Sequence, residues 1–279
     1  MTDPVPGLLP APLVTALAGF AARPAVLVAV DFDGTLAPLV ADPSTSRPLP
    51  AARDALHALD ALDGVRVALV SGRTLADLRR LADPPPAAVL VGSHGAQMEL
   101  PGAVPAAQPD PAVDLPEPAR LLLAQVVDRL RAITAAHPGT SVEVKPSTAV
   151  LHTRGADRTL AAAATAQVLA GPAALAGVHV MHGKEVVEIA VTDVTKGTAL
   201  LRLRGLLRLP AAGGVLYVGD DVTDERAFAV LDDDAGDVTV KVGDGPTAAR
   251  HRVPTPEAVA TLLHTLLTDL TPTAAPPFP

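Results

Sequence analysis

The chain has 279 residues, 49% of them hydrophobic, so it is long enough to bury the core of one large domain or of two smaller ones. Its formal net charge of −8 and aromatic content of 2% argue against nucleic-acid binding, which needs basic grooves and stacking platforms. The sequence has no cysteine, which excludes disulfides and thiolate metal sites and is typical of a cytoplasmic protein.

The start of the chain, MTDPVPG, lacks the basic region of a signal peptide. No stretch is apolar over the length that a membrane-spanning helix needs. We therefore expect neither secretion nor a membrane partner.

Helical and strand patterns alternate over the first hundred residues. The expected elements are a helix over 11–21, a strand over 25–31, a helix over 50–61, a strand over 65–70, a helix ending near 81 and a strand over 87–91. The strands are continuous apolar runs, which is typical of parallel strands buried on both faces. This alternation predicts βαβ units in an α/β fold with a Rossmann-like, doubly wound parallel sheet.

The order of elements changes in the middle of the chain. After a Pro-rich connector, the patterns predict a helix over 119–136, strands over 141–145 and 148–153, a helix over 157–170, and strands over 177–182 and 185–191. This order predicts a smaller α+β domain over 103–192, inserted into a core domain formed by 1–102 and 193–279.

The alternation resumes after the insertion. The expected elements are a helix over 195–209, a strand over 215–218, a helix from Thr223, a strand over 238–242 and a helix over 256–269.

Carboxylates follow two of the predicted core strands. Asp31 and Asp33 come directly after the first strand, and the sequence GDDVTDE (219–225) follows the strand over 215–218. The carboxyl ends of parallel strands meet at one edge of the sheet, where ligands bind. Converging carboxylates repel one another unless they share a cation, and Mg²⁺ prefers such oxygen ligands. The predicted Mg²⁺ ligands are Asp31, Asp33 and Asp220, with Asp221 and Asp224 behind them.

A serine and a lysine add anion-binding groups to this edge. Ser71 follows the second strand, and Lys196 is the basic residue in the first turn of its helix, where the helix dipole disfavours a cation unless an anion lies nearby. We predict that both hold phosphoryl oxygens, together with backbone N–H groups of the turn over 31–35.

The two acids after the first strand suit phosphoryl transfer. Asp31 would attack phosphorus to form an aspartyl phosphate. Asp33 would give a proton to the leaving oxygen and then activate the water that cleaves the intermediate.

Each motif also has an ordinary structural explanation. Asp31 and Asp33 could form an Asx-turn that leads into Gly34. Ser71 could be a helix N-cap. The acidic residues over 220–225 could be the solvated start of a helix.

The motifs DFDGT (31–35), Ser71 of SGR, Lys196 and GDDVTDE (219–225) resemble, in this order, the four motifs of the haloacid dehalogenase superfamily. The resemblance implies a cap domain inserted between the second and third motifs. The second acid, Asp33, implies hydrolysis of phosphate esters rather than dehalogenation or phosphonate cleavage.

Further segments are similar to the trehalose-6-phosphate phosphatase family: GDDVTDE with Thr223, VEVKPSTAVLHTR (142–154) and HGKEVVEI (182–189). The resemblance implies Mg²⁺-dependent hydrolysis of trehalose 6-phosphate to trehalose and phosphate. The residues that it implies for substrate binding are Arg73, Glu143, Lys145, Lys184 and Glu188. The four in the inserted domain could instead pair across strands on a solvated sheet face.

The sequence departs from that family at two places in the inserted domain. Thr153 stands where the family usually has Tyr, and Ala190-Val191 where it has Arg-Pro. Phosphatases for sucrose, glucosylglycerol or mannosylglycerate phosphates therefore stay open as alternatives, as do a phosphomutase and a non-catalytic sugar-phosphate sensor. We expect a cytoplasmic monomer whose partner is the small-molecule sugar phosphate.

Overall fold

The computed structural model describes residues 9–102, 115–183 and 185–271. The chain forms two compact units. The core unit comprises residues 1–104 and 195–279, and the inserted unit comprises residues 105–194. The inserted domain predicted from the sequence spans 103–192.

A mainly parallel sheet forms the centre of the core unit. Its strands are β1 (Val26–Val30), β2 (Val65–Val70), β3 (Val89–Gly92), β4 (Gln97–Glu99), β9 (Gly214–Gly219), β10 (Val238–Val242) and β11 (His251–Val253). Their order is β11-β10-β9-β1-β2-β3-β4, and every neighbouring pair is parallel except β3 with β4. Because the chain adds strands first on one side of β1 and later on the other, the predicted doubly wound α/β fold is confirmed.

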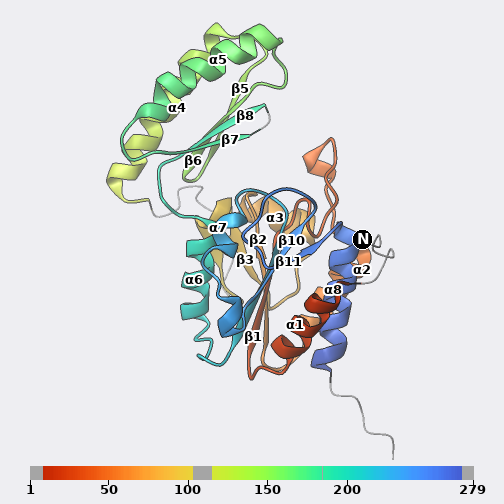
Figure 1. Ribbon diagram of the computed structural model, residues 1–279. Helices are drawn as coiled ribbons and strands as arrows, with labels where there is room; N and C mark the ends of the chain where they lie inside the picture. The colour runs from red at the N-terminus through yellow and green to blue at the C-terminus, as the bar shows by residue number, and fades with distance from the viewer. Residues whose placement is uncertain (1–8, 103–114, 184, 272–279) are drawn as a thin grey trace, which may run out of the picture. The chain divides into compact units, whose positions relative to one another are not determined.

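Helices cover both faces of this sheet. They are α1 (Ala11–Ala21), α2 (Pro50–Asp60), α3 (Leu75–Ala82), α6 (Lys196–Leu206), α7 (Glu225–Phe228) and α8 (Pro256–Leu270). Helices α1, α2 and α8 lie on one side of the sheet, and α6 and α7 lie on the other (Figure 1).

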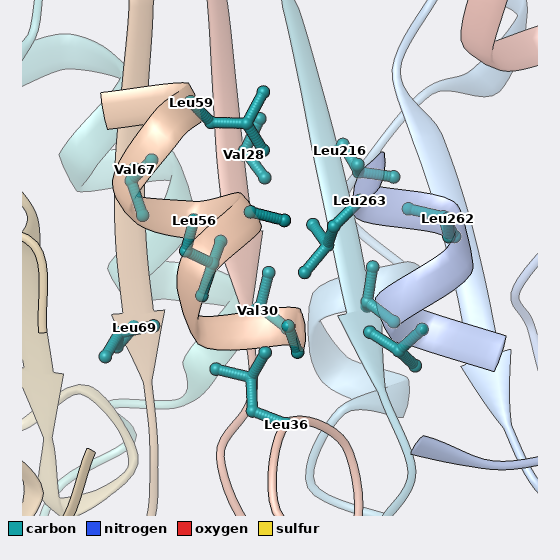
Figure 2. Packing of buried hydrophobic residues seen from close by; sticks show 14 of the residues in the cluster. Val28, Val30, Leu36, Leu56, Leu59, Val67, Leu69, Leu216, Leu262 and Leu263 are labelled. Atoms are coloured by element: carbon teal, nitrogen blue, oxygen red, sulfur yellow. The ribbon is translucent and has the colours of Figure 1, made fainter. Parts of the chain in front are cut away.

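Successive side chains of a strand point to opposite faces of the sheet, so each strand contributes to the hydrophobic clusters on both faces. In β1, Val28 and Val30 pack with Leu56 of α2 and Leu263 of α8 (Figure 2), whereas Ala29 packs on the side of α6 and α7. Both sets are fully buried. A strand that is apolar on both faces can be stable only in this position, which is why the continuous apolar run predicts it.

Three core elements differ from the sequence expectations. Strands β4 and β11 have three residues each, too few for a period-2 pattern to be recognised in the sequence. The helix expected from Thr223 is a single turn that begins at Glu225.

The inserted unit contains α4 (Glu117–Ala136), β5 (Ser141–Lys145), β6 (Thr148–His152), α5 (Arg158–Ala170), β7 (His179–Gly183) and β8 (Val186–Ala190). Its strands form an antiparallel sheet in the order β5-β6-β8-β7. Helices α4 and α5 cover one face of that sheet (Figure 1). The order of elements is the α+β order that the sequence predicts.

No helix within the described residues is long and apolar enough to cross a membrane.

Candidate active site

Three carboxylates converge at the carboxyl edge of the core sheet. Asp31 follows β1 and Asp220 follows β9, its neighbour in the sheet, so the parallel ladder brings the two side by side. Asp224 joins them, and one oxygen of each carboxylate lies within 4.8 Å of the others. Among the described residues, this is the group of acidic or histidine side chains that could hold a metal ion. We call Asp31, Asp220 and Asp224 the carboxylate group.

Lys196 supplies the positive charge beside this group. It is the first residue of α6, whose N-cap is Thr195. Its Nζ donates to Oδ1 of Asp31 over 2.8 Å and to Oδ1 of Asp224 over 2.8 Å, and the lysine is only 2% exposed. Burial lowers the pKa of Lys196, but the two carboxylates outweigh this effect and raise its pKa above the ordinary value. The ammonium group is therefore permanently charged.

The carboxylate group carries more negative charge than Lys196 neutralises. Burial raises the pKa of Asp31 well above its ordinary value, and the neighbouring Asp224 and Asp220 act in the same direction against Lys196. Burial, followed by repulsion from Asp224, raises the pKa of Asp220 to about 6. A hard divalent cation bound by these oxygens would relieve that repulsion, so the donor set fits Mg²⁺.

Asp224 is fully engaged by protein donors. Its Oδ1 accepts from Lys196 and, over 2.6 Å, from the hydroxyl of Tyr217, while its Oδ2 accepts from the backbone N–H of Asp221 over 2.9 Å. Tyr217 lies in β9 on the side of α6 and α7, where its ring meets that of Phe228 edge to face at 5.7 Å. Asp224 thus orients Lys196 toward Asp31, and its place behind the metal ligands stays a prediction.

Backbone and hydroxyl groups hold Asp220. Gly34 has φ +79°, and a Cβ atom at this residue would lie 2.1 Å from Oδ2 of Asp220, so a glycine is required here. The hydroxyl of Thr35 donates to Oδ1 of Asp220 over 3.2 Å. The buried amine of Lys241, in β10, donates to the backbone carbonyl of Asp220.

Asp33 does not join the carboxylate group, although we expected it to be a metal ligand. Its Oδ2 accepts from Nε of Arg73 and its Oδ1 from Nη2 of Arg73, both over 2.6 Å. The hydroxyl of Ser46 donates to the same Oδ1 over 3.0 Å. Both oxygens of Asp33 are therefore occupied by a guanidinium and a hydroxyl, and its role as a metal ligand stays a prediction.

Ser71 lies buried at the end of β2, the other neighbour of β1. Its hydroxyl accepts from the backbone N–H of Arg73 over 3.1 Å. It is not the N-cap of the following helix, because α3 begins at Leu75 with Thr74 as its cap.

The other structural explanations apply only in part. The Asp31 carboxylate accepts from the distant Lys196, which an Asx-turn would not require. Within the acidic sequence after β9, Asp221 is exposed, as a solvated helix start would be, but Asp224 is 0% exposed.

The predicted sugar-binding residues of the inserted unit form ion pairs on the sheet face that α4 and α5 leave uncovered. Lys145 Nζ lies 3.7 Å from Oε2 of Glu188, and His152 Nε2 lies 2.9 Å from Oε2 of Glu143. Burial raises the pKa of Glu188, and Lys145 opposes that shift. Lys184 lies outside the described residues.

An open cavity of about 380 Å³ adjoins the carboxylate group within the core unit. Its lining residues are Gly34, Pro38, Leu39, Asp220, Val242, Gly243, Asp244, Pro254 and Pro256.

Four residues of this site are not predicted from the sequence: Ser46, Tyr217, Lys241 and, for its side chain, Thr35. Thr35 lies in the DFDGT motif, and Tyr217 is the one tyrosine of the chain, in an otherwise aliphatic strand. No sequence pattern indicates Ser46 or Lys241. Ser46 contacts Asp33 and Lys241 contacts the carbonyl of Asp220, and both contacts depend on the conformation of loops.

Comparison with known proteins gives consistent results. The sequence model described as trehalose-phosphatase matches residues 29–256. A trehalose-phosphate phosphatase of Mycolicibacterium paratuberculosis is 36% identical over 270 residues, which cover 90% of this chain and 64% of that protein. A bifunctional trehalose-6-phosphate synthase/phosphatase of Thermoproteus tenax is 33% identical over 86% of this chain and 32% of its own length. The chain thus spans less than two thirds of the length of these relatives.

Solved structures share the fold. The C-terminal domain of trehalose-6-phosphate phosphatase from C. albicans superposes with a TM-score of 0.73 and 25% identity, covering 95% of this chain and 99% of that one. A trehalose-6-phosphate phosphatase from Aspergillus fumigatus superposes with a TM-score of 0.68 and 26% identity, covering 92% and 97% of the two chains.

Proposed function

The chain belongs to the trehalose-phosphatase family, and from this membership we propose that it is a Mg²⁺-dependent phosphatase that hydrolyses trehalose 6-phosphate to trehalose and phosphate. The observation that supports the chemistry most directly is the carboxylate group with Lys196 paired to Asp31 and Asp224. The side chains that we propose as the nucleophile, the cation and the metal ligands lie together at the edge of the sheet where ligands bind.

Asp31 and Asp220 would hold the metal ion, with Asp224 behind them, since its oxygens accept from Lys196, Tyr217 and Asp221. A bound Mg²⁺ would offset the negative charge of the carboxylates and of the phosphoryl oxygens. Lys196 acts in the same sense, because its ammonium opposes the burial that raises the pKa of Asp31.

The first step transfers the phosphoryl group to Asp31. One carboxylate oxygen of Asp31 attacks phosphorus and forms the aspartyl phosphate, while the bond from phosphorus to the 6-oxygen of the sugar breaks. The leaving oxygen keeps the electron pair of that bond and takes a proton from Asp33. Trehalose is released.

The second step hydrolyses the intermediate. Asp33, now a carboxylate, takes a proton from water while the water oxygen attacks phosphorus. The bond between phosphorus and Asp31 breaks, and its electron pair returns to the Asp31 carboxylate. Inorganic phosphate is released, and both acids regain their starting states.

Phosphate release from a panel of sugar phosphates tests this proposal. We expect trehalose 6-phosphate to react fastest in the presence of Mg²⁺, and a chelator to abolish the reaction. Faster hydrolysis of sucrose, glucosylglycerol or mannosylglycerate phosphate would assign another substrate. An isomerised sugar phosphate would indicate a mutase, and binding without turnover would indicate a sensor.

We also propose that the protein is a cytoplasmic monomer whose partner is the sugar phosphate and not a nucleic acid. The cysteine-free, acidic composition supports a reducing compartment and disfavours polyanions. Light scattering on the purified protein tests the monomeric state.

A further inference from the structure

We propose that Arg73 is the positioning residue of Asp33: its guanidinium holds this carboxylate apart from the carboxylate group and presents it for proton transfer. The inference rests on the proposed function, because it takes Asp33 as the proton carrier. It replaces the expectation that Arg73 binds the substrate directly.

The contact between the two side chains is a two-pronged ion pair. Nε of Arg73 meets Oδ2 of Asp33 and Nη2 meets Oδ1, each over 2.6 Å. A planar guanidinium fixes the orientation of a carboxylate in this arrangement, which a single contact would not do. Ser46, from the loop before α2, adds a third donor over 3.0 Å.

Arg73 is itself anchored from several directions. Its guanidinium carbon lies 5.4 Å from the centre of the Phe32 ring, over its face. Its backbone N–H donates to the hydroxyl of Ser71 over 3.1 Å, and its carbonyl accepts from the N–H of Ser93 over 2.7 Å. Its side chain is 16% exposed. The pair with Asp33 is therefore a fixed part of the core unit rather than a mobile surface contact.

This pairing gives the two acids of the DFDGT motif different surroundings. Asp31 faces the ammonium of Lys196 and the carboxylate group, whereas Asp33 faces a guanidinium and a hydroxyl. Arg73 stays protonated at any working pH, so it can orient Asp33 without itself exchanging protons. Asp33 remains the proton carrier.

The experiment uses leaving groups with different needs for a proton. The alkoxide of a sugar phosphate must be protonated as it leaves, whereas 4-nitrophenolate leaves without a proton. For Arg73→Met we expect kcat/KM for trehalose 6-phosphate to fall by about 10²- to 10³-fold, the scale of general acid catalysis. For 4-nitrophenyl phosphate we expect a change of less than about threefold, since kcat/KM reports the steps up to formation of the aspartyl phosphate.

Matched variants separate this role from a structural one. Arg80→Met removes an exposed arginine of α3 that pairs with Asp77 and should leave both rates unchanged. Asp33→Asn should show the same leaving-group dependence, and the double variant Asp33→Asn with Arg73→Met should lose no more than Asp33→Asn alone. Arg73→Lys keeps the charge but not the two-pronged geometry, and should recover part of the rate. Far-UV circular dichroism checks the fold of every variant.

Several results would overturn the inference. Equal losses for both esters, with a raised KM, would mean that Arg73 binds the phosphoryl group, and unchanged rates for both would mean that it has no role in the reaction. If Arg73→Met fails to fold, Arg73→Lys must show the loss for the sugar phosphate alone. If the wild type does not hydrolyse trehalose 6-phosphate but hydrolyses another alkyl phosphate, the proposed substrate is wrong. The effect of Arg73→Met on that ester and on 4-nitrophenyl phosphate then decides the role of Arg73. A wild type that hydrolyses no phosphate ester would overturn both.

Discussion

The ammonium of Lys196 lies 2.8 Å from the carboxylate of Asp31, although 165 positions separate the two residues in the sequence. The contact forms because the first turn of α6 and the end of β1 meet at the carboxyl edge of the sheet, with the inserted unit accounting for most of the intervening chain. Both side chains are buried, so neither charge can be offset by water. The pair is therefore as important for the stability of the core unit as for its chemistry.

Lys196→Met should lower both activity and stability. Removing one partner of a buried ion pair leaves uncompensated charge, which costs about 3 to 5 kcal/mol of unfolding free energy. The loss of a fixed donor beside the phosphoryl group should lower kcat by about 10²- to 10³-fold. Urea unfolding and phosphate release measure the two effects. Arg202→Met, at an exposed position of α6, is the matched control, and equal effects of the two substitutions would contradict a special role for Lys196.

The metal-free protein should become more stable as the pH falls from 7 to 5. The pKa of Asp220 rises from an ordinary value of 3.8 to about 6 in the folded state, and that of Asp31 is also raised, both through burial. Between the ordinary pKa of 3.8 and the folded-state pKa of about 6, Asp220 binds more protons in the folded state than in the unfolded chain. The free energy of unfolding therefore falls as the pH rises through this range. Mg²⁺ competes with those protons, so its stabilising effect should be largest at pH 7 and decline below pH 6.

Thermal unfolding with and without Mg²⁺ measures this linkage. Asp220→Asn should reduce the difference between pH 5 and pH 7 in the metal-free protein. Asp128→Asn, at an exposed position of α4, should leave the difference unchanged. Stabilisation by Mg²⁺ that is as large at pH 5 as at pH 7 would argue against binding through these carboxylates.

Tyr217→Phe should loosen Asp224 and, through it, Lys196. The hydroxyl donates to Asp224 over 2.6 Å in a fully buried place, and a hydrogen bond to a charged acceptor contributes about 1.5 to 3 kcal/mol. Urea unfolding measures this loss. Phe preserves the edge-to-face contact with Phe228, so the loss reports the hydroxyl rather than the ring.

Tyr217 is also a spectroscopic probe of the site. The chain has one tyrosine and no tryptophan, so tyrosine emission comes from this residue alone. Titration with Mg²⁺ should change the emission, because the acceptor of its hydroxyl is a member of the carboxylate group. Emission that stays constant while Mg²⁺ raises the unfolding temperature would place the bound ion elsewhere.

The parts of the fold and site that depend on local pattern could be predicted from the sequence. The apolar run of β1 ends at Asp31, and the rule that parallel strand ends gather ligands brings Asp31 and Asp220 to one place. The helix that begins at Lys196 follows from the same alternation of strands and helices.

The partners of each carboxylate could not be predicted, because they depend on register and on loops. Asp224 reaches the carboxylate group from the turn that precedes the short α7, and the sequence does not indicate where that helix begins. Tyr217 meets Asp224 only because of the face of β9 on which it lies. Asp33 pairs with Arg73 because the turn after β2 directs the guanidinium toward it, a geometry that the spacing of two acids does not contain.

Glu188→Gln should distinguish the two explanations of the charged face of the inserted unit. Glu188 and Lys145 are mostly buried and lie 3.7 Å apart, with β6 between their strands, so they do not form a directly cross-strand pair. If these side chains bind the sugar, KM for trehalose 6-phosphate should rise about tenfold or more while kcat/KM for 4-nitrophenyl phosphate stays constant, because the buried polar group would lose a substrate partner. Glu185→Gln, which affects an exposed ion pair with Arg154, is the control. Glu188→Gln could instead lower the unfolding temperature and leave the ratio of kcat/KM for trehalose 6-phosphate to kcat/KM for 4-nitrophenyl phosphate unchanged. In that case the charged residues stabilise the sheet and do not bind the sugar.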